Sequence, residues 1–186
     1  REFTAKELGF GKVQNNPIYC QLSRGKFEGT ILHALSQIMF DLNRMAADVI
    51  LFSMDTFGFF QIPKEFSAGS SIMPQKYNAD ILEIMRSNYH VLVSNEMVIK
   101  NCLSGLITGY NTDVRPIKEA TIKSFEITKQ SLELASFLFG GLKVDANKCK
   151  EHLTSEIYAT AEAYQLVKKG IPFRQAYRQV AKKYAK

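Results

Sequence analysis

Apolar residues recur along residues 27–57 at alternating spacings of four and three. This spacing is typical of a helix that packs in a bundle or coiled coil. A helix of about thirty residues is roughly 45 Å long, which exceeds the usual helix of a compact domain. We expect its buried seam to consist of Ile31, Leu35, Ile38, Leu42, Met45 and Val49, and the stripe to be widened by Leu32, Met39 and Ile50.

Residues 79–106 show two adjacent apolar seams, which predicts a helix in the middle of a bundle or of an oligomer core. One seam contains Met85, Tyr89, Leu92, Ile99, Leu103 and Leu106, and the other contains Ile81, Ile84, Val91, Val98 and Cys102. A third long helix is expected to bury Phe125, Thr128, Leu132, Ala135 and Phe139, and to end at Gly140 and Gly141.

The last forty or so residues predict a smaller helical unit. Asp145 is a suitable N-cap for a short helix, Gly170 should end the helix that follows, and Pro172 should begin the last one. The predicted fold class is therefore all-α. A long-helix bundle domain is expected over residues 1–143, and a small helical carboxy-terminal domain over residues 144–186.

Composition adds few constraints. The 46% of hydrophobic residues suffices for a packed core, and the net charge is +6. Three widely spaced cysteines suggest neither a disulfide framework nor a zinc site, and no apolar run reaches a membrane span, so we expect a soluble, cytoplasmic protein without a membrane partner. The chain begins at Arg1 without a cap or turn signal, which suggests a piece of a longer protein.

The segment 69–83, GSSIMPQKYNADILE, interrupts the helical pattern and carries candidate chemistry. Lys76 and Asn78 stand where the next helix begins, and the positive end of a helix adds to the field of a lysine. The arrangement predicts a pocket for a carboxylate or phosphate. A serine in that field loses its proton more readily and could act as a base or a nucleophile.

The same segment resembles the G-S-S-x-M-P-x-K-x-N signature of the fumarase, aspartase and argininosuccinate lyase superfamily, and Gln75 resembles the argininosuccinate lyases in particular. Further similarity lies in REFTAKELGF, FGFFQIPKEF, GYNTD and LVKKGIPFRQAYRQV. The resemblance covers the carboxy-terminal part of such an enzyme. The histidine segment that the family uses lies in its amino-terminal part.

The resemblance implies a role for each residue of the segment. Ser70 would be the general base, on a loop that moves to close over the substrate. Lys76 and Asn78 would hold the dianionic intermediate, and Ser71 would contact a carboxylate. Glu83 would act in catalysis by orienting the lysine or a histidine from elsewhere.

The resemblance also implies substrate-binding roles outside the segment. Tyr110 and Lys118 match family positions that bind argininosuccinate, and Arg115 stands where the family usually has glutamine. Four copies form the core in this family, with each active site built from three of them, and no metal or cofactor takes part. A homotetramer is therefore expected of the whole enzyme, and little activity of the isolated chain.

Departures from the family pattern leave the substrate open. Tyr77 replaces a second lysine and Ala79 a proline, and Arg115 adds a guanidinium that would suit a carboxylate. Argininosuccinate cleavage to arginine and fumarate, in arginine biosynthesis, is the first hypothesis. The alternatives are another fumarate-releasing lyase and a non-catalytic structural protein of the kind found among lens crystallins.

A different class of function rests on charge alone. Residues 168–186 contain seven lysines and arginines and no acidic residue, next to a helix-turn-helix corner. Basic residues on the outer face of an amphipathic helix are usually only solvated. The expectation is that the protein does not bind nucleic acid.

Overall fold

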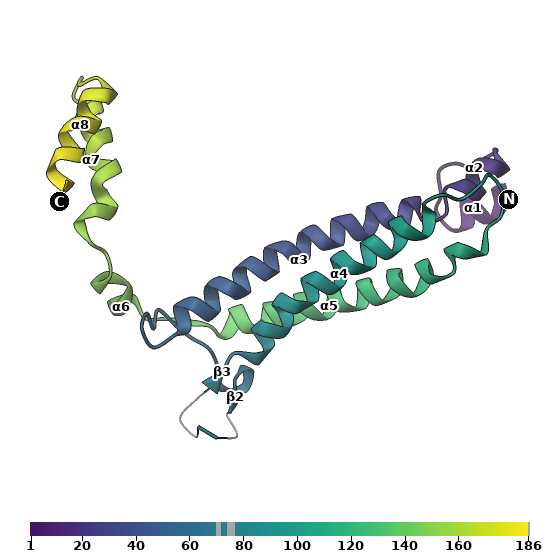
Figure 1. Cartoon of the computed structure of the whole chain (residues 1–186), viewed down its shortest axis with the longest axis horizontal. Coiled ribbons are helices and arrows are strands. Elements are labelled where there is room, and N and C mark those ends of the chain that lie inside the picture. Colours follow the sequence, from purple (N-terminus) through teal and green to yellow (C-terminus); the bar gives the residue numbers. More distant parts are fainter. Residues whose placement is uncertain (70–71, 74–76, 186) are drawn as a thin grey trace. The chain divides into compact units, whose positions relative to one another are not determined.

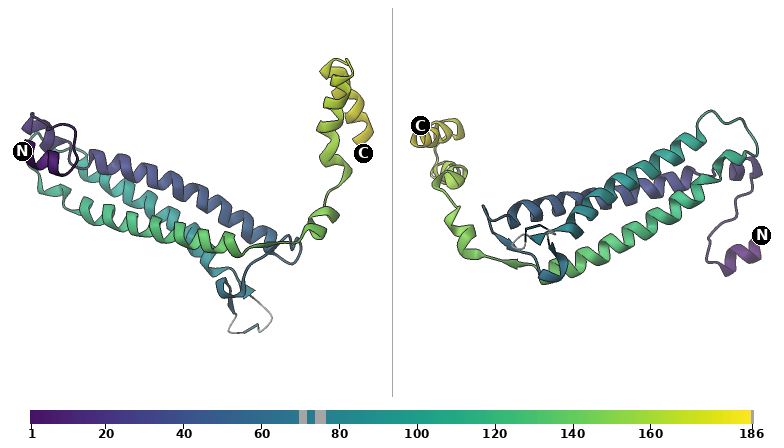
Figure 2. Two further views of the ribbon diagram at one scale, coloured as in Figure 1. Left: turned by 180° about the vertical axis from the view of Figure 1, so that it is seen from behind. Right: turned by 60° about the horizontal axis from the view of Figure 1, so that its bottom comes forward.

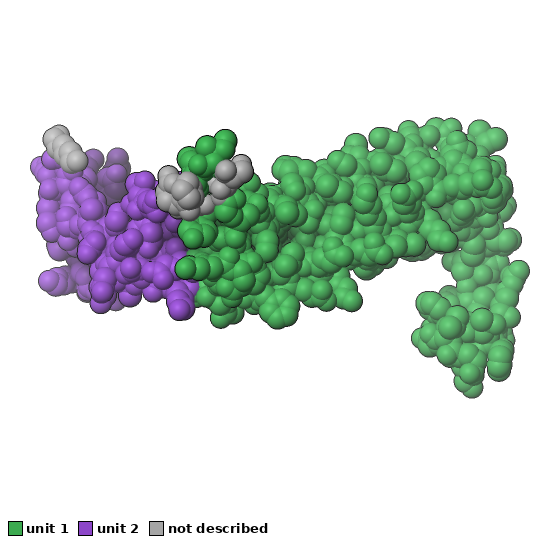
Figure 3. Space-filling view, turned by 90° about the horizontal axis from the view of Figure 1, so that it is seen from below, with its two compact units in different colours: residues 1–51, 62–142 green, residues 52–61, 143–186 purple. Residues whose placement is uncertain are grey.

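The computed structural model describes residues 1–69, 72–73 and 77–185. Two compact units can be distinguished in the chain, as Figure 3 shows in green and purple. Unit 1 contains residues 1–51 and 62–142, and unit 2 contains residues 52–61 and 143–186. The expected all-α fold class is confirmed, since helices dominate both units and the strands are two residues long.

Three long helices lie side by side in unit 1 (Figures 1 and 2): α3 (Lys26–Ser53), α4 (Asp80–Leu103) and α5 (Pro116–Gly141). The two short helices α1 (Glu2–Glu7) and α2 (Pro17–Leu22) precede them. The three long helices confirm those predicted from apolar periodicity. Pro116 occupies the first turn of α5, where its missing N–H costs nothing.

Small polar residues bring α4 and α5 together in an antiparallel pair. The Asn88 amide donates to Ser131 Oγ over 3.3 Å, and the Asn95 amide donates to Ser124 Oγ over 3.0 Å. Both donors and both acceptors are seven residues apart, so the two bonds share one register. The buried face of α5 is correspondingly small and partly polar: Ile117, Ala120, Ser124, Thr128, Ser131, Ala135 and Leu138.

That face differs from the one the sequence predicts for α5. Thr128 and Ala135 are buried as expected, but Phe125 is 48% exposed and Leu132 is 43% exposed. Close packing of two helices favours small side chains at the contact, because large rings would hold the backbones apart. The large side chains of Phe125 and Leu132 therefore stay exposed.

The buried stripe of α3 includes only part of the predicted one. Leu42 and Val49 are buried as expected, whereas Ile31, Ile38 and Met45 are each about 40% exposed. Leu32 and Met39, which are expected to widen the stripe, are buried too, and Ser36 and Ala46 are the other buried residues of α3. On α4 the second predicted seam is likewise open, with Ile84, Val91 and Val98 exposed. The long helices thus keep apolar stripes that this single chain does not cover.

One end of the bundle closes around Gly25, the residue before α3. Its φ is +81°, and a Cβ there would lie 2.6 Å from Cδ1 of Ile117 and 2.9 Å from Cδ2 of Leu103. The backbone N–H of Gly25 donates to Glu28 Oε2 over 2.7 Å. A core cluster is formed at this end by Leu32, Ile99, Val114, Ile117 and Ala120.

The loops of unit 1 contain short elements. The 3-10 turns are η1 (Lys64–Phe66) and η2 (Thr112–Val114), and the strands β2 (Ala68–Gly69) and β3 (Tyr77–Asn78) form a two-stranded antiparallel pair. Within the described residues, no helix combines the length and apolar character needed to cross a membrane.

Unit 2 is held by an aromatic cluster and a helix pair. Strand β1 (Phe60–Gln61) pairs antiparallel with β4 (Lys143–Val144), and the rings of Phe52, Phe57 and Phe59 pack within 6 Å of one another. The Asp145 carboxylate caps α6 (Ala146–Glu151) as predicted. The elements that follow are η3 (Ser155–Tyr158), α7 (Ala159–Lys168) and α8 (Phe173–Tyr184).

Helices α7 and α8 pack through small residues and one polar contact. Ala163 and Ala176 are buried, and the Glu162 carboxylate accepts bonds from Lys183 Nζ and the Tyr184 hydroxyl. Gly170 has a φ of +90° just beyond α7, where the sequence predicts the end of that helix. Of the basic residues near the carboxy terminus, Lys183 therefore has an acidic partner within unit 2.

Substitution of Gly25 tests the close packing at its end of the bundle. Gly25→Ala should lower the free energy of unfolding by about 1–2 kcal/mol for the positive φ and by about 1–3 kcal/mol more for the clash with Ile117 and Leu103. Gly105→Ala is the matched control, because Gly105 also has a positive φ, +73°, but open space around it. Denaturant unfolding of the full-length protein measures both. Equal losses of unfolding free energy in the two variants would contradict the close packing of Gly25 against Ile117 and Leu103.

Candidate active site

A small two-stranded β-ladder at the start of α4 includes Gly69, Tyr77 and Asn78 of the signature segment. Ala68 pairs with Asn78, and Gly69 pairs with Tyr77. Figure 1 shows the two strands beside the first turn of α4. Ser70, Ser71 and Lys76, which the sequence predicts as base, carboxylate contact and cation, lie outside the described residues.

Asn78 and Glu83 are the predicted site residues described at this end. Asn78 is half-buried and precedes α4 by two residues, while Glu83 is exposed in its first turn. Ala79 stands directly before the helix and has no side-chain oxygen to cap it. This end of α4 therefore combines backbone N–H groups and the positive end of the helix dipole with an amide and a carboxylate.

Tyr110, Arg115 and Lys118 gather beyond the opposite end of α4. Tyr110 is 70% exposed in the segment that leads to η2, and the Asn111 amide donates to the carbonyl oxygens of Ile107 and Gly109, 3.0 and 3.3 Å away. Arg115 directly precedes α5 and Lys118 lies in its first turn, both exposed. The structure thus brings three predicted binding residues to one end of unit 1.

The two groups of predicted residues are separated by the length of α4. This helix has 24 residues, and a rise of 1.5 Å per residue makes it about 36 Å long. Asn78 and Glu83 lie at its start, and Tyr110 follows its end. A single chain does not bring the two groups into one site.

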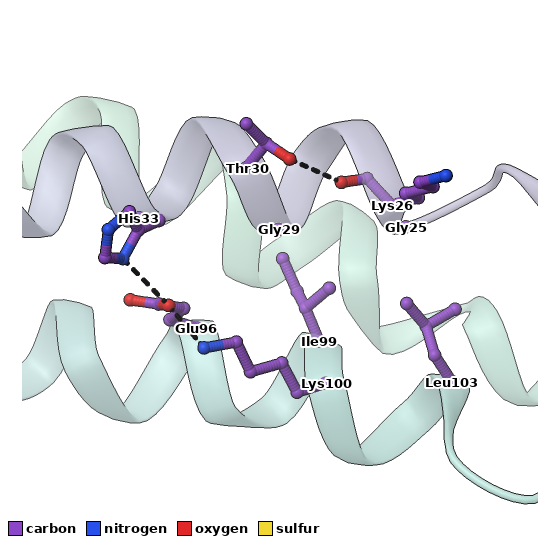
Figure 4. Close-up of a pocket in the computed structure, with 9 residues that line it drawn as sticks. All are labelled: Gly25, Lys26, Gly29, Thr30, His33, Glu96, Ile99, Lys100 and Leu103. Atoms are coloured by element: carbon purple, nitrogen blue, oxygen red, sulfur yellow. Dashed lines mark hydrogen bonds and ion pairs between the residues drawn. The ribbon is translucent and has the colours of Figure 1, made fainter.

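A pocket of about 310 Å³ lies between α3 and α4, and its lining includes none of the predicted site residues. Figure 4 shows His33 on α3 facing Glu96 and Lys100 on α4. The lining consists of Gly25, Lys26, Gly29, Thr30, His33, Glu96, Ile99, Lys100 and Leu103.

Glu96 is a buried carboxylate that joins the two helices beside this pocket. Its Oε1 lies 2.6 Å from Lys100 Nζ and 3.3 Å from His33 Nδ1, and its Oε2 accepts from the Ser36 hydroxyl over 3.1 Å. Burial alone would raise the pKa of Glu96, but the bonds from Lys100 and Ser36 and the charges of Lys100 and His33 lower it below its ordinary value of 4.5.

Sequence reasoning did not single out this cluster. The available signal was Ser36 and Glu96, two polar residues at positions that face other helices in an otherwise apolar pattern. In the part of the chain that the structure describes, His, Cys, Asp and Glu side chains do not gather in groups of three or more as a metal site requires.

Comparison with known proteins defines the class. A family model described as lyase matches residues 1–93, half of the chain. The chain therefore belongs to this lyase family, in agreement with the resemblance of its signature segment.

Relatives to which the chain is similar include argininosuccinate lyases. The enzyme of Thermotoga neapolitana is 50% identical over 186 residues, all of this chain and 47% of the relative. That of Xanthomonas oryzae is 39% identical over 181 residues, 97% of this chain and 42% of the relative. The chain thus spans less than half the length of these relatives.

Solved structures support the fold. An EDDS lyase in complex with formate gives a TM-score of 0.75 at 21% identity, over 97% of this chain and 36% of that one. A fumarate lyase:delta crystallin from Brucella melitensis gives a TM-score of 0.72 at 21% identity, over 92% of this chain and 43% of that one. The arrangement of long helices is therefore shared with these lyases.

The lowered pKa of Glu96 makes the stability of the bundle depend on pH. The folded carboxyl binds a proton less readily than the unfolded one, so the unfolded state takes up protons first and stability falls as the solution is acidified. The contribution of Glu96 is present above its ordinary pKa of 4.5 and is lost as the pH falls through the lower folded value.

Glu96→Gln should therefore cost about 1–3 kcal/mol near neutral pH, and the difference from the parent should shrink as the pH falls below 4.5. Glu133→Gln is the matched control, because Glu133 forms an exposed i,i+4 contact of 4.0 Å with Lys129 and should contribute about 0–1 kcal/mol at any pH. Denaturant unfolding of the full-length protein over a pH series measures both. A pH-independent effect of Glu96→Gln would contradict the role of its charge.

Proposed function

We propose that this chain forms part of an argininosuccinate lyase, which cleaves argininosuccinate into arginine and fumarate. The observation that carries the proposal is the retained signature, with Ser70, Lys76 and Asn78 at their family spacing, in a chain half identical to the argininosuccinate lyase of Thermotoga neapolitana. The reaction would serve arginine biosynthesis, in the cytoplasm. We also propose that the chain comprises a helical-bundle domain over residues 1–143 and a small helical carboxy-terminal domain over residues 144–186.

The proposed chemistry is a β-elimination with Ser70 as the general base. Its oxygen removes the proton from the succinyl carbon next to a carboxylate, and the electron pair moves into that carboxylate to give a dianionic intermediate. Lys76 and Asn78 stabilise this charge. The pair then returns to form the double bond of fumarate, while the carbon–nitrogen bond breaks and the leaving nitrogen of arginine takes a proton.

The other residues are proposed to orient the reacting groups. Ser71 contacts a carboxylate, and Glu83 orients Lys76 or a histidine from elsewhere in the protein. Tyr110, Arg115 and Lys118 bind the amino-acid end and a carboxylate of argininosuccinate. The exposure of Tyr110 and of both cations supports this, since a binding residue has to be accessible.

We also propose that the enzyme is a homotetramer whose sites combine residues from different copies. Two observations support this. The candidate residues lie at opposite ends of a helix of 24 residues, and apolar stripes on α3 and α4 are left exposed by the single chain. A neighbouring copy that runs antiparallel would cover such stripes and bring Asn78 of one chain near Tyr110 of another.

A second candidate function is elimination of fumarate from another succinyl amine. Arg115 favours it, because a guanidinium in place of the family's glutamine suits a carboxylate on the leaving group and offers no acceptor to the guanidinium of arginine. Tyr77 in place of a second lysine weakens the positive field near Lys76. A non-catalytic, crystallin-like protein would retain none of the activity.

Ser70→Ala tests the proposed base in the full-length enzyme. Fumarate release from argininosuccinate, followed by ultraviolet absorbance, should fall by about 10²- to 10⁴-fold with the fold intact. Ser87→Ala, which removes an exposed hydroxyl bonded to its own helix, should leave the rate unchanged. A parent enzyme that binds argininosuccinate but releases no fumarate would contradict the proposed function itself.

Co-expression of two inactive variants tests whether sites combine different copies. Asn78→Ala and Tyr110→Ala change residues at opposite ends of α4. Random mixed tetramers should recover up to about a quarter of the parent activity. In about a quarter of the sites, the copy that supplies Asn78 and the copy that supplies Tyr110 are both unsubstituted at the residue they supply.

The control pairs Tyr110→Ala with Lys118→Ala, which lie at the same end of unit 1. This mixture should recover no activity. Each site takes both residues from one copy, and every copy in the mixture lacks one of the two. Recovery in neither mixture would contradict sites shared in the proposed way.

A further inference from the structure

Arg24 lies against Tyr110, although sequence reasoning assigned it no role. Its guanidinium carbon is 5.4 Å from the centre of the Tyr110 ring, within the range of a cation–π contact. Arg24 belongs to the turn before α3, and Tyr110 to the segment after α4. The contact therefore joins two segments of unit 1 that are far apart in the sequence.

The backbone on both sides of Arg24 is held in place. Ser23 is buried and its hydroxyl donates to the Cys20 carbonyl oxygen over 3.2 Å. Gly25 is buried with a positive φ, has no room for a side chain, and donates its N–H to Glu28. Arg24 therefore extends from a turn with a defined position.

Tyr110, in contrast, has little packing to fix its ring. It is 70% exposed, and the hydrogen bonds of the neighbouring Asn111 hold the backbone of the segment but do not involve the ring. A binding side chain that is not held loses conformational entropy when the substrate arrives, which weakens binding. A cation over one face of the ring reduces that loss.

We propose that Arg24 is a positioning residue that holds the ring of Tyr110 in the orientation that binds substrate. The inference rests on the proposed function, in which Tyr110 contacts argininosuccinate. Arg24 acts through the ring and belongs, with Tyr110, Arg115 and Lys118, to one end of unit 1. Its loss should affect substrate affinity more than the chemical step.

The test compares Arg24→Gln with Arg44→Gln in the full-length enzyme. Arg44 makes the same kind of contact, 5.7 Å from the Phe40 ring, on the middle of α3. Arg24→Gln should raise KM for argininosuccinate about two- to fivefold, the range of an exposed cation–π contact, with a smaller change in kcat. Arg24→Lys, which keeps the cation, should retain more of the affinity, and Arg44→Gln should change neither constant.

A double substitution separates this role from a general structural one. Tyr110→Leu removes the ring, so adding Arg24→Gln to it should raise KM by less than about 1.5-fold more. If Arg24→Gln has its full effect without the ring, or if it behaves as Arg44→Gln does, the inference is wrong while the proposed function stands. If Tyr110→Leu itself leaves KM unchanged, the substrate-binding role of Tyr110 fails, and the inference fails with it.

Discussion

The antiparallel contact between α4 and α5 sets the positions of the other parts of unit 1. Buried serines on α5 let the two backbones approach, and the amides of Asn88 and Asn95 bond to them in a single register. Shifting one helix along the other would break both bonds at once and leave the half-buried amides without their partners on α5. The register therefore fixes where α5 begins relative to the end of α4, and with it Tyr110, Arg115 and Lys118.

The length of α4 keeps the two groups of candidate site residues apart. Asn78 and Glu83 begin α4, while the residues proposed to bind the amino-acid end of the substrate follow it. A straight helix of this length cannot bring them together within one chain, which is why we propose that several copies share each site. Glu96 holds α3 to α4 through its contacts with His33 and Ser36, and its buried charge is paired with Lys100, which ties the third long helix to this frame.

Much of the fold could be predicted from the sequence, because apolar periodicity and local capping are properties of neighbouring residues. The three long helices, the cap at Asp145 and the turn at Gly170 all appear where those signals place them. The identity of the buried stripe could not be predicted in the same way. Helices that are apolar over a wide arc have several faces of similar hydrophobicity, and only their packing partners select one, as Ile31 and Leu132 show.

The signature of residues 69–83 and the family to which the chain belongs were determined by the sequence alone, because residue types at short spacing carry that information. The tertiary structure decided which candidate residues share a location. It placed Arg24 over Tyr110 and grouped His33 and Ser36 with Glu96 and Lys100. Each of the contacts between different segments joins residues that are 60 or more positions apart in the sequence. It also put Asn78 and Tyr110 at opposite ends of one helix, because distance in a folded chain depends on helix length and direction.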